Sequence, residues 1–224
     1  MEPYIINADA RNDLLQAEAD TWMVGAYVRQ GFGNFSVGAD LVYGWSDWTA
    51  SRTMPTLSRI AMAQFDSTEL RGDLRAEYMF DFGGGWVAPF GQLSFRKFNL
   101  DGFTEEGAGS LGLVVEEADD TVLTPILGLR AGTTFDAGMA TLRPELSLSY
   151  SFNDDNSSFR DVAYLGAPNN SFRLQGVEPE GYFTIGAGLF ADIGANSGAF
   201  VRGSYATGGN VNVSSVNAGV TIGF

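Results

Sequence analysis

Apolar and polar side chains alternate along several long stretches of the chain. In the clearest stretch, residues 68–82, the even positions are mostly apolar and end in aromatic rings, whereas the odd positions are mostly charged. A period of two places successive side chains on opposite faces, which is the geometry of a β-strand and not of a helix. We therefore expect a strand with one apolar face and one charged face.

The same alternation recurs along the chain and predicts nine strands. They are residues 21–33, 34–47, 67–82, 85–99, 120–136, 138–153, 181–194, 198–207 and 210–224, with a strand-like extension within 158–177. Soluble strands average about five or six residues, and a tilted membrane strand needs about 9–11. The lengths favour an all-β, antiparallel meander that forms a transmembrane β-barrel. A soluble β-sandwich, which also alternates, is the less favoured alternative.

Aromatic residues gather near the ends of the apolar faces, as membrane barrels require at their two interfaces. The expected aromatic girdle consists of Trp22, Tyr43, Trp45, Tyr78, Phe80, Tyr150 and Phe152.

The connections between the expected strands alternate in length. Residues 33–34, 82–85 and 136–138 form tight turns, whereas 48–66, 100–119 and 154–180 form long loops. Outer-membrane barrels have short periplasmic turns and longer external loops. We therefore expect the long loops outside the cell and the C-terminus in the periplasm.

The number of strands bears on the completeness of the barrel. Nine strands that end in the periplasm begin outside, whereas bacterial barrels have even strand numbers. Residues 1–19 are expected to be a loop-like N-terminal remnant without a secretory signal pattern, followed by the barrel over 20–224. We expect the C-terminal part of a larger barrel, with an odd number of strands missing. The alternative is a short tenth strand at residues 4–7 and closure at ten strands.

Composition restricts the possible chemistry. The chain has no histidine and no cysteine, which excludes Ser-His-Asp catalysis, disulfides and thiolate metal sites. A net charge of -14 disfavours nucleic acid as a partner. The mean hydropathy of -0.01 is the average over two sets of residues, one that faces lipid and one that faces water. We expect no enzyme activity, no cofactor and no metal.

A series of short motifs resembles the autotransporter β-domain in order and spacing. The motifs are Trp22-Met23-Val24-Gly25-Ala26-Tyr27, Gly33-Asn34-Phe35, Tyr43-Gly44-Trp45-Ser46-Asp47, Leu100 to Ala108, Leu127-Gly128-Leu129-Arg130-Ala131, Arg143-Pro144, Phe172 to Gly176 and Gly186-Ala187-Gly188-Leu189. The resemblance covers nearly everything from residue 20 onward. It implies a twelve-stranded outer-membrane barrel of type V secretion in a Gram-negative bacterium, with a helix in its pore and a passenger upstream. By this resemblance the sequence is a fragment that holds the last nine strands and lacks pore helix, linker and passenger.

The last expected strand resembles the signal that the barrel-assembly machinery reads. Its apolar face consists of Val216, Ala218, Val220, Ile222 and Phe224. A terminal strand can pair with another sheet through its main chain, while alternate side chains give specificity.

Charged residues at alternate strand positions are expected to face the lumen, because a charge facing lipid costs about 2–4 kcal/mol near the midplane. They are Glu69, Arg71, Asp73, Arg75, Glu77, Arg96, Arg130, Arg143, Glu145 and Arg202. One interpretation is a hydrophilic pore that passes a polypeptide, and the other is a cross-strand ion-pair network. We favour the network for most of these residues and expect the two roles to overlap.

Acidic residues cluster in the expected external loops at Glu105, Glu106, Glu116, Glu117, Asp119, Asp120, Asp154 and Asp155. Clustered carboxylates could bind Ca²⁺ or Mg²⁺. However, no D-x-D-x-D-G spacing is present, so solvated loops are expected.

Together these features predict a translocator for secretion or surface display of an upstream passenger. Its expected partners are outer-membrane lipid, the barrel-assembly machinery and the passenger polypeptide, with no nucleic acid. The alternatives are a small self-contained structural or adhesion barrel of the outer membrane and, less favoured, a soluble binding module.

Overall fold

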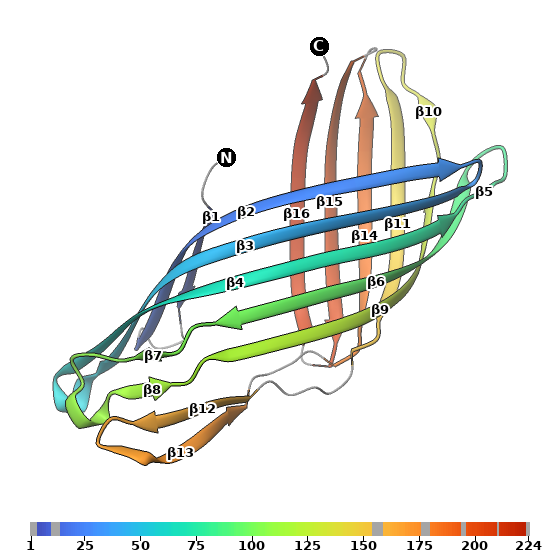
Figure 1. The fold of residues 1–224 in the computed structure, drawn as a ribbon. Coiled ribbons are helices and arrows are strands. Elements are labelled where there is room, and N and C mark those ends of the chain that lie inside the picture. Colours follow the sequence, from blue (N-terminus) through green and yellow to red (C-terminus); the bar gives the residue numbers. More distant parts are fainter. Residues whose placement is uncertain are drawn as a thin grey trace.

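One antiparallel sheet forms most of the molecule in the computed structural model (Figure 1). The structure describes residues 4–9, 14–153, 159–175, 180–193, 196–209 and 211–222. The strands of this sheet are β1 (Tyr4–Asp9), β2 (Leu15–Phe32), β3 (Phe35–Met54), β4 (Arg59–Tyr78), β5 (Phe80–Asp81), β6 (Trp86–Leu100), β9 (Ala118–Gly132), β10 (Phe135–Asp136), β11 (Thr141–Ser151), β14 (Tyr182–Asp192), β15 (Ser197–Gly208) and β16 (Val211–Ile222).

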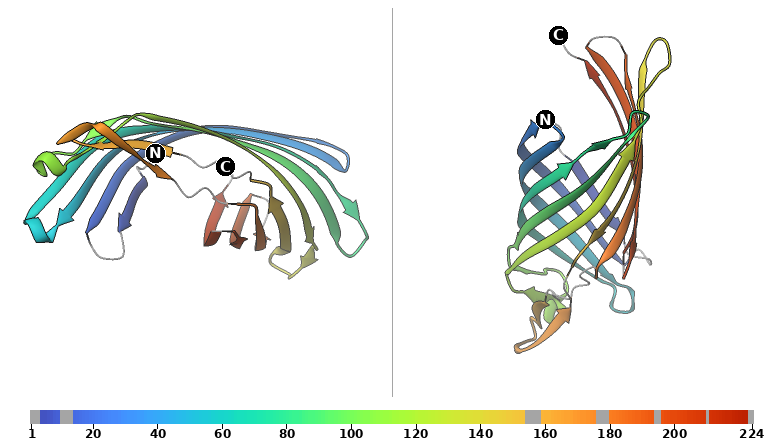
Figure 2. Two further views of the ribbon diagram at one scale, coloured as in Figure 1. Left: turned by 90° about the horizontal axis from the view of Figure 1, so that it is seen from below. Right: turned by 90° about the vertical axis from the view of Figure 1, so that its right-hand side faces the viewer.

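The long strands follow one another in a simple meander. Their order is β1-β2-β3-β4-β6-β9-β11-β14-β15-β16, with the short β5 and β10 paired to β6 and β11. Every pairing is antiparallel, as connections of hairpin type require. Figure 2 shows this sheet curled into an open half-barrel. Among the described residues β1 and β16 do not pair with each other, so closure at ten strands is not seen.

Several strands are longer than the alternation predicted. Residues 48–66 are not a long loop, because β3 and β4 continue in register through them as far as Met54 and Arg59. Only the 3₁₀ turn Pro55–Leu57 and Ser58 separate the two strands. Small side chains in this extension, Ala61 and Ala63, are buried.

The N-terminal segment also differs from the expectation. Residues 1–19 were expected to be loop-like, but Tyr4–Asp9 pairs with Gln16–Thr21 of β2. The short tenth strand considered as an alternative is therefore present. Backbone pairing stabilises this segment although its side chains give little alternation.

A second, smaller sheet is built from residues 103–115, which were expected to belong to a loop, and from the strand-like extension that was expected within residues 158–177. It contains β7 (Phe103–Thr104), β8 (Leu113–Val115), β12 (Phe159–Tyr164) and β13 (Ala167–Gln175) in the order β13-β12-β8-β7. The main chains of Met62 and Glu106 exchange two hydrogen bonds, of 2.9 and 2.8 Å, which connect this sheet to β4. The strands β7 and β8, with two and three residues, are too short to show a period.

The two ends of the barrel wall differ in their connections. We call them the turn end, which carries the tight turns at Gly33 and Gly83, and the loop end, which carries the second sheet and the short β3–β4 connection. Gly33 and Gly83 occupy tight turns with φ of 63° and 76°, a region that glycine adopts without strain. Apart from β-structure, the described residues form two 3₁₀ turns, Pro55–Leu57 and Gly109–Leu111, and no helix among them has the length and apolarity to span a membrane.

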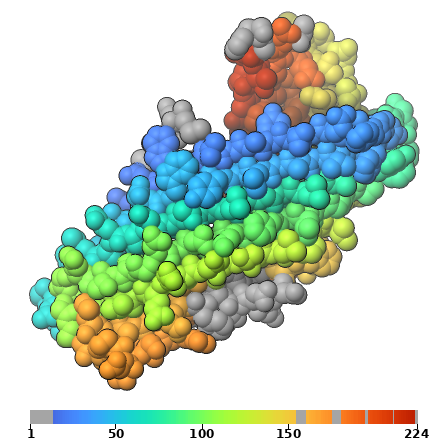
Figure 3. Space-filling view, viewed as in Figure 1, coloured from blue at the N-terminus to red at the C-terminus, as the bar shows by residue number. Residues whose placement is uncertain are grey.

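The two faces of the main sheet differ in exposure. Leucines of the apolar face stay exposed, with Leu74, Leu127 and Leu146 at 55%, 59% and 64%. In the space-filling view the side chains of β2 to β9 form oblique, closely packed rows on the outer side of the wall (Figure 3). A contiguous exposed apolar surface of this kind is typical of contact with lipid or with another protein.

Candidate functional site

The opposite, concave face carries the charged residues that the sequence assigned to the lumen. All ten lie in the main sheet on one face, as the strand registers show. Glu69, Arg71, Asp73, Arg75 and Glu77 lie on β4, Arg96 on β6, Arg130 on β9, Arg143 and Glu145 on β11, and Arg202 on β15. The period of two in each strand and the antiparallel register bring them to the same face.

Glu77 is the centre of the largest ion cluster. Its carboxylate lies 2.9 Å from Arg75, 2.9 Å from Arg130 and 3.5 Å from Arg29. The side chain of Glu77 is only 9% exposed. Arg29 was not among the residues expected to face the lumen, although it stands on an alternating strand at a position that points to this face.

Arg130 extends the cluster to the next strand. Its Nε and Nη2 atoms donate hydrogen bonds of 2.8 and 2.5 Å to the two carboxylate oxygens of Glu145. Such bidentate contacts are among the strongest charge-assisted hydrogen bonds. Further along the wall, Arg143 on β11 pairs with Asp192 on β14 at 3.0 Å.

A second cluster lies nearer the loop end. Glu69 binds Arg71 at 2.9 Å and Arg96 at 2.6 Å. Asp73 accepts hydrogen bonds from Gln92, at 2.8 Å, and from the hydroxyl of Ser94. Carboxylates and arginines of this face therefore form ion pairs both within a strand and between strands.

Aromatic rings that were not predicted for this face lie beside its arginines. Arg75 lies 3.5 Å above the centroid of the Phe90 ring, and Arg130 lies 5.4 Å from the centroid of Trp86. Arg202 lies 5.8 and 5.3 Å from the rings of Phe190 and Phe200. Cation–π attraction favours these arrangements. The available signal was the alternation itself, because each of these rings occupies a position of the polar set of its strand.

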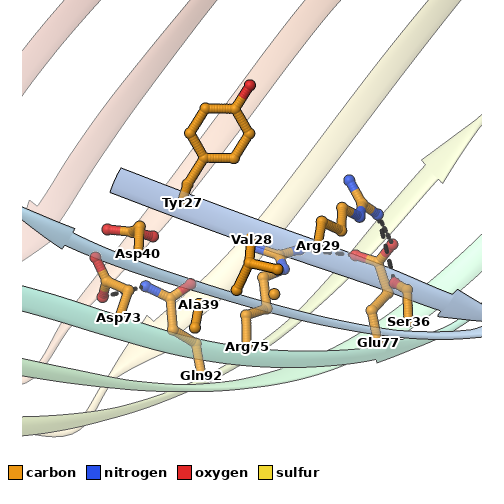
Figure 4. Close-up of a pocket in the computed structure, with 11 residues that line it drawn as sticks. Tyr27, Val28, Arg29, Ser36, Ala39, Asp40, Asp73, Arg75, Glu77 and Gln92 are labelled. Atoms are coloured by element: carbon orange, nitrogen blue, oxygen red, sulfur yellow. Dashed lines mark hydrogen bonds and ion pairs between the residues drawn. The ribbon is translucent and has the colours of Figure 1, made fainter. Parts of the chain in front are cut away.

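Two of the cavities on this face lie beside the ion clusters. One, of about 210 Å³, is lined by Tyr27, Asp40, Asp73, Arg75, Glu77 and Gln92 among others (Figure 4). The other, of about 480 Å³, is lined by Arg29, Glu77, Trp86, Arg130, Arg143, Glu145 and Phe190 among others. Charged groups and rings line both cavities, as expected of a wet surface that can contact a polypeptide.

The residues predicted to form the aromatic girdle lie on the convex face in two groups. Trp22 faces Trp45 across β2 and β3, and Tyr150 lies on Phe152 with ring centroids 4.8 Å apart. Tyr78 and Phe80, also 4.8 Å apart, form the group at the turn end. The group that contains Tyr43 and Trp45 lies towards the loop end.

The spacing of these groups can be compared with a bilayer. Phe35, which pairs with Tyr78 of the turn-end group, lies ten residues from Trp45 on β3, or about 33 Å along the strand at about 3.3 Å per residue. A tilt of about 40° reduces this to about 25 Å, the height of the apolar band of outer-membrane barrels.

The predicted assembly signal lies largely on β16, an edge strand of the main sheet. Val216, Val220 and Ile222 are 78%, 74% and 68% exposed, and Ala218 is exposed on the same face. Phe224 lies outside the described residues. A long edge strand with an exposed apolar face is available for pairing with another strand.

The acidic segments are not solvated loops throughout, which corrects the expectation. Glu105 binds Arg52. Asp119 binds Lys97 at 2.9 Å, and Asp120 pairs with Arg160. Asp154 and Asp155 lie outside the described residues. No group of three potential metal ligands occurs in the part of the chain that the structure describes.

An antiparallel meander with an exposed apolar face and a charged concave face defines the wall of a membrane β-barrel. The family model of the autotransporter β-domain matches residues 6–223. The chain belongs to the autotransporter β-domain family, a non-catalytic barrel family of the bacterial outer membrane and of type V secretion. The resemblance and the fold class expected from the sequence are confirmed.

Solved structures share the fold at low sequence identity. The translocator domain of the autotransporter NalP from Neisseria meningitidis matches with a TM-score of 0.73 and 18% identity, over 94% of this chain and 69% of that chain. The β-domain of the Bordetella autotransporter BrkA matches with a TM-score of 0.66 and 16% identity, over 99% and 88%. No curated protein matches the sequence.

Proposed function

We propose that this chain forms the wall of a translocator that carries a passenger polypeptide across the outer membrane for secretion or display. The observation that carries the proposal is the charged concave face, on which arginines and carboxylates pair with one another. A wall of neutralised charges offers hydration along its length and no continuous apolar surface that would retain an unfolded chain. In this proposal the barrel performs no catalysis and needs neither cofactor nor metal.

The orientation follows from the difference between the two ends. The turn end faces the periplasm, and the loop end with its second sheet faces the outside, as in barrels with short periplasmic turns and longer external loops. The convex face contacts outer-membrane lipid, with its aromatic groups at the two interfaces.

Assembly of the barrel depends on β16 in this proposal. The barrel-assembly machinery pairs with the edge of β16 and reads its exposed apolar face, together with Phe224. Deletion of Phe224 should lower the amount of folded protein in the outer membrane. As a comparison on the same strand, Val220→Asp should impair insertion more than Asn217→Asp, because Asn217 belongs to the opposite, polar face. Equal outer-membrane levels of all three variants would contradict this role.

A cross-linking experiment tests passage of the polypeptide. The chain has no cysteine, so single cysteines can be introduced in the full natural chain. Tyr27→Cys stands on the concave face at an 87% exposed position, and Val24→Cys stands on the convex face at a 50% exposed position. A passenger with one cysteine, stalled during export, should form a disulfide with position 27 and not with position 24.

The same experiment separates the alternatives. A folded outer-membrane barrel that never cross-links to a stalled passenger would favour a structural or adhesion barrel. A purified chain that is soluble without detergent would favour the soluble binding module and contradict the membrane proposal.

A further inference from the structure

Four residues of the concave face form a chain of alternating charge near the turn end. We call Arg29, Glu77, Arg130 and Glu145 the charge belt. Arg29 lies 3.5 Å from Glu77, Glu77 lies 2.9 Å from Arg130, and Arg130 lies 2.5 Å from Glu145. These residues stand on β2, β4, β9 and β11, so the belt crosses six successive strands of the sheet.

Two contacts of the charge belt pass over an intervening strand. Arg29 on β2 reaches Glu77 on β4 across β3, and Glu77 reaches Arg130 on β9 across β6. Strands two positions apart are separated by about 9.5 Å. When a sheet bends towards the face that carries these side chains, their tips come closer together, so each contact favours the bent sheet over a flatter one.

The intervening strands leave room for these contacts. Gly38 and Ser36 of β3 lie opposite Arg29 and Glu77 in the register, and Arg29 donates a hydrogen bond of 3.4 Å to the Ser36 hydroxyl. On β6, Ala88 faces Arg130. Small side chains at these positions allow the long charged side chains to cross above the backbone.

The second ion cluster has a different geometry. Glu69 pairs with Arg71 on its own strand and with Arg96 on the adjacent β6. Neither contact passes over another strand, so this cluster depends little on the curvature of the sheet. It supplies a matched control on the same strand and the same face.

We propose that the charge belt fixes the curvature of the barrel wall at the turn end, and with it the width of the lumen there. The significance of this width for polypeptide entry rests on the proposed function, whereas the curvature itself does not.

Distance measurements between spin labels test the proposal directly. Asn34→Cys and Met139→Cys place labels on two turns at the turn end, and both positions are exposed. The full natural chain is labelled and reconstituted in lipid vesicles. Glu77→Gln should shift the label distance to longer values and broaden its distribution, whereas Glu69→Gln should leave it unchanged. Equal distributions in the parent and Glu77→Gln would overturn the proposal.

A double-mutant cycle asks whether the belt acts as one unit. Glu77 and Glu145 share Arg130 as a partner. If the belt acts as a unit, the distance shifts of Glu77→Gln and Glu145→Gln combine non-additively, because either change already interrupts the chain of ion pairs at Arg130. Additive shifts would mean independent local ion pairs and would also overturn the proposal.

A milder variant covers the case in which Glu77→Gln does not fold. Arg29→Gln removes the outermost group of the belt, whose side chain is 64% exposed, and should give a smaller shift in the same direction. An unchanged distance in Arg29→Gln, with Glu77→Gln unfolded, would count against the proposal. None of these measurements uses a passenger. A failure of export would therefore contradict the proposed function and would not contradict the proposal about the charge belt.

Discussion

The ring of Phe90 lies directly over the backbone of Gly128. A Cβ atom at position 128 would lie 2.3 Å from Cζ of Phe90 and 2.8 Å from the carbonyl oxygen of Leu148. Glycine therefore allows a ring from β6 to lie flat on β9, and Arg75 then stacks on this ring at 3.5 Å. Local packing of this kind supports the ion cluster above it.

Replacing this glycine should destabilise the barrel. Gly128→Ala forces the ring or the neighbouring strand to move, and overpacking of this kind costs about 1–3 kcal/mol. Urea unfolding in lipid vesicles measures the change. Gly91→Ala is the matched control, because its Cβ would meet only Leu127, at 3.6 Å. Equal stability of the two variants would contradict the interpretation of the contact.

Glu105 should hold the second sheet against the barrel wall. Its carboxylate accepts hydrogen bonds of 3.1 and 2.5 Å from Arg52 and one of 3.0 Å from the main-chain N–H of Leu113. The hydrogen bond to Glu105 also raises the pKa of the Arg52 guanidinium. A hydrogen bond to a charged group contributes about 1.5–3 kcal/mol. Glu105→Gln should therefore increase amide hydrogen exchange in residues 103–115 by about 30-fold for a loss of about 2 kcal/mol.

The neighbouring acid provides the control for that measurement. Glu106 is exposed and joins β4 through its main chain. Glu106→Gln should leave hydrogen exchange in the second sheet unchanged. Faster exchange in Glu106→Gln than in Glu105→Gln would argue against the ion pair as the attachment.

Adjacent residues on β9 should distinguish the lipid face from the lumen face. Leu127 belongs to the convex face and Ile126 to the concave face. Leu127→Arg should reduce folding into vesicles by about 2–4 kcal/mol, the cost of an arginine that faces lipid near the midplane. Ile126→Arg should be tolerated much better. Similar folding yields for both variants would show that the convex face does not contact lipid.

Asp66 should make stability depend on pH at the loop end. Asp20, Asp47 and Asp66 face one another on three neighbouring strands, two residues beyond the Trp22–Trp45 pair. Partial desolvation, the negative charge of Asp47 and a hydrogen bond to Asp47 raise the pKa of Asp66 above its ordinary value of 3.8. A raised pKa in the folded state means that the folded protein binds a proton more tightly, so stability falls as pH rises through the interval above 3.8.

The corresponding variant removes this effect. Asp66→Asn should be more stable than the parent at pH 7, and the difference should vanish once the pH is below the ordinary value of an aspartate. The temperature at which the folded barrel loses its fast electrophoretic mobility, measured from pH 3 to pH 8, provides the comparison. A parent protein that gains stability with rising pH over this range, relative to Asp66→Asn, would contradict the sign of the effect.

The sequence predicted the long strands because each carries a physical signal of its own. Residues 68–82 alternate along most of their length, and this pattern determines which side chains of β4 share a face. The segments 48–54 and 59–66 lack that alternation, yet they continue β3 and β4, because backbone pairing extends wherever the partner strand continues. Strands as short as β7 and β8 carry too few residues to show a period.

The sequence predicted which charged residues share the concave face, but it did not predict which of them contact one another. Glu77 and Arg130 were both assigned to the lumen face, but their contact joins strands that are not neighbours in the sheet. Arg29 was not predicted, because nothing in its own strand distinguishes an arginine that joins an ion cluster from one that is solvated. Phe90 was not predicted, because aromatic rings were expected only on the apolar faces of the strands.

By itself the sequence determined which residues share a face and therefore the class of the fold, because alternation is a local property of each strand. Tertiary structure alone decided which charges meet across an intervening strand, and which loop segments pair into a second sheet. Both depend on the curvature of the wall and on contacts between residues far apart in the chain. Glu77 and Arg130, 53 positions apart, meet at 2.9 Å only because the meander places β4 and β9 on either side of β6 and bends them towards each other.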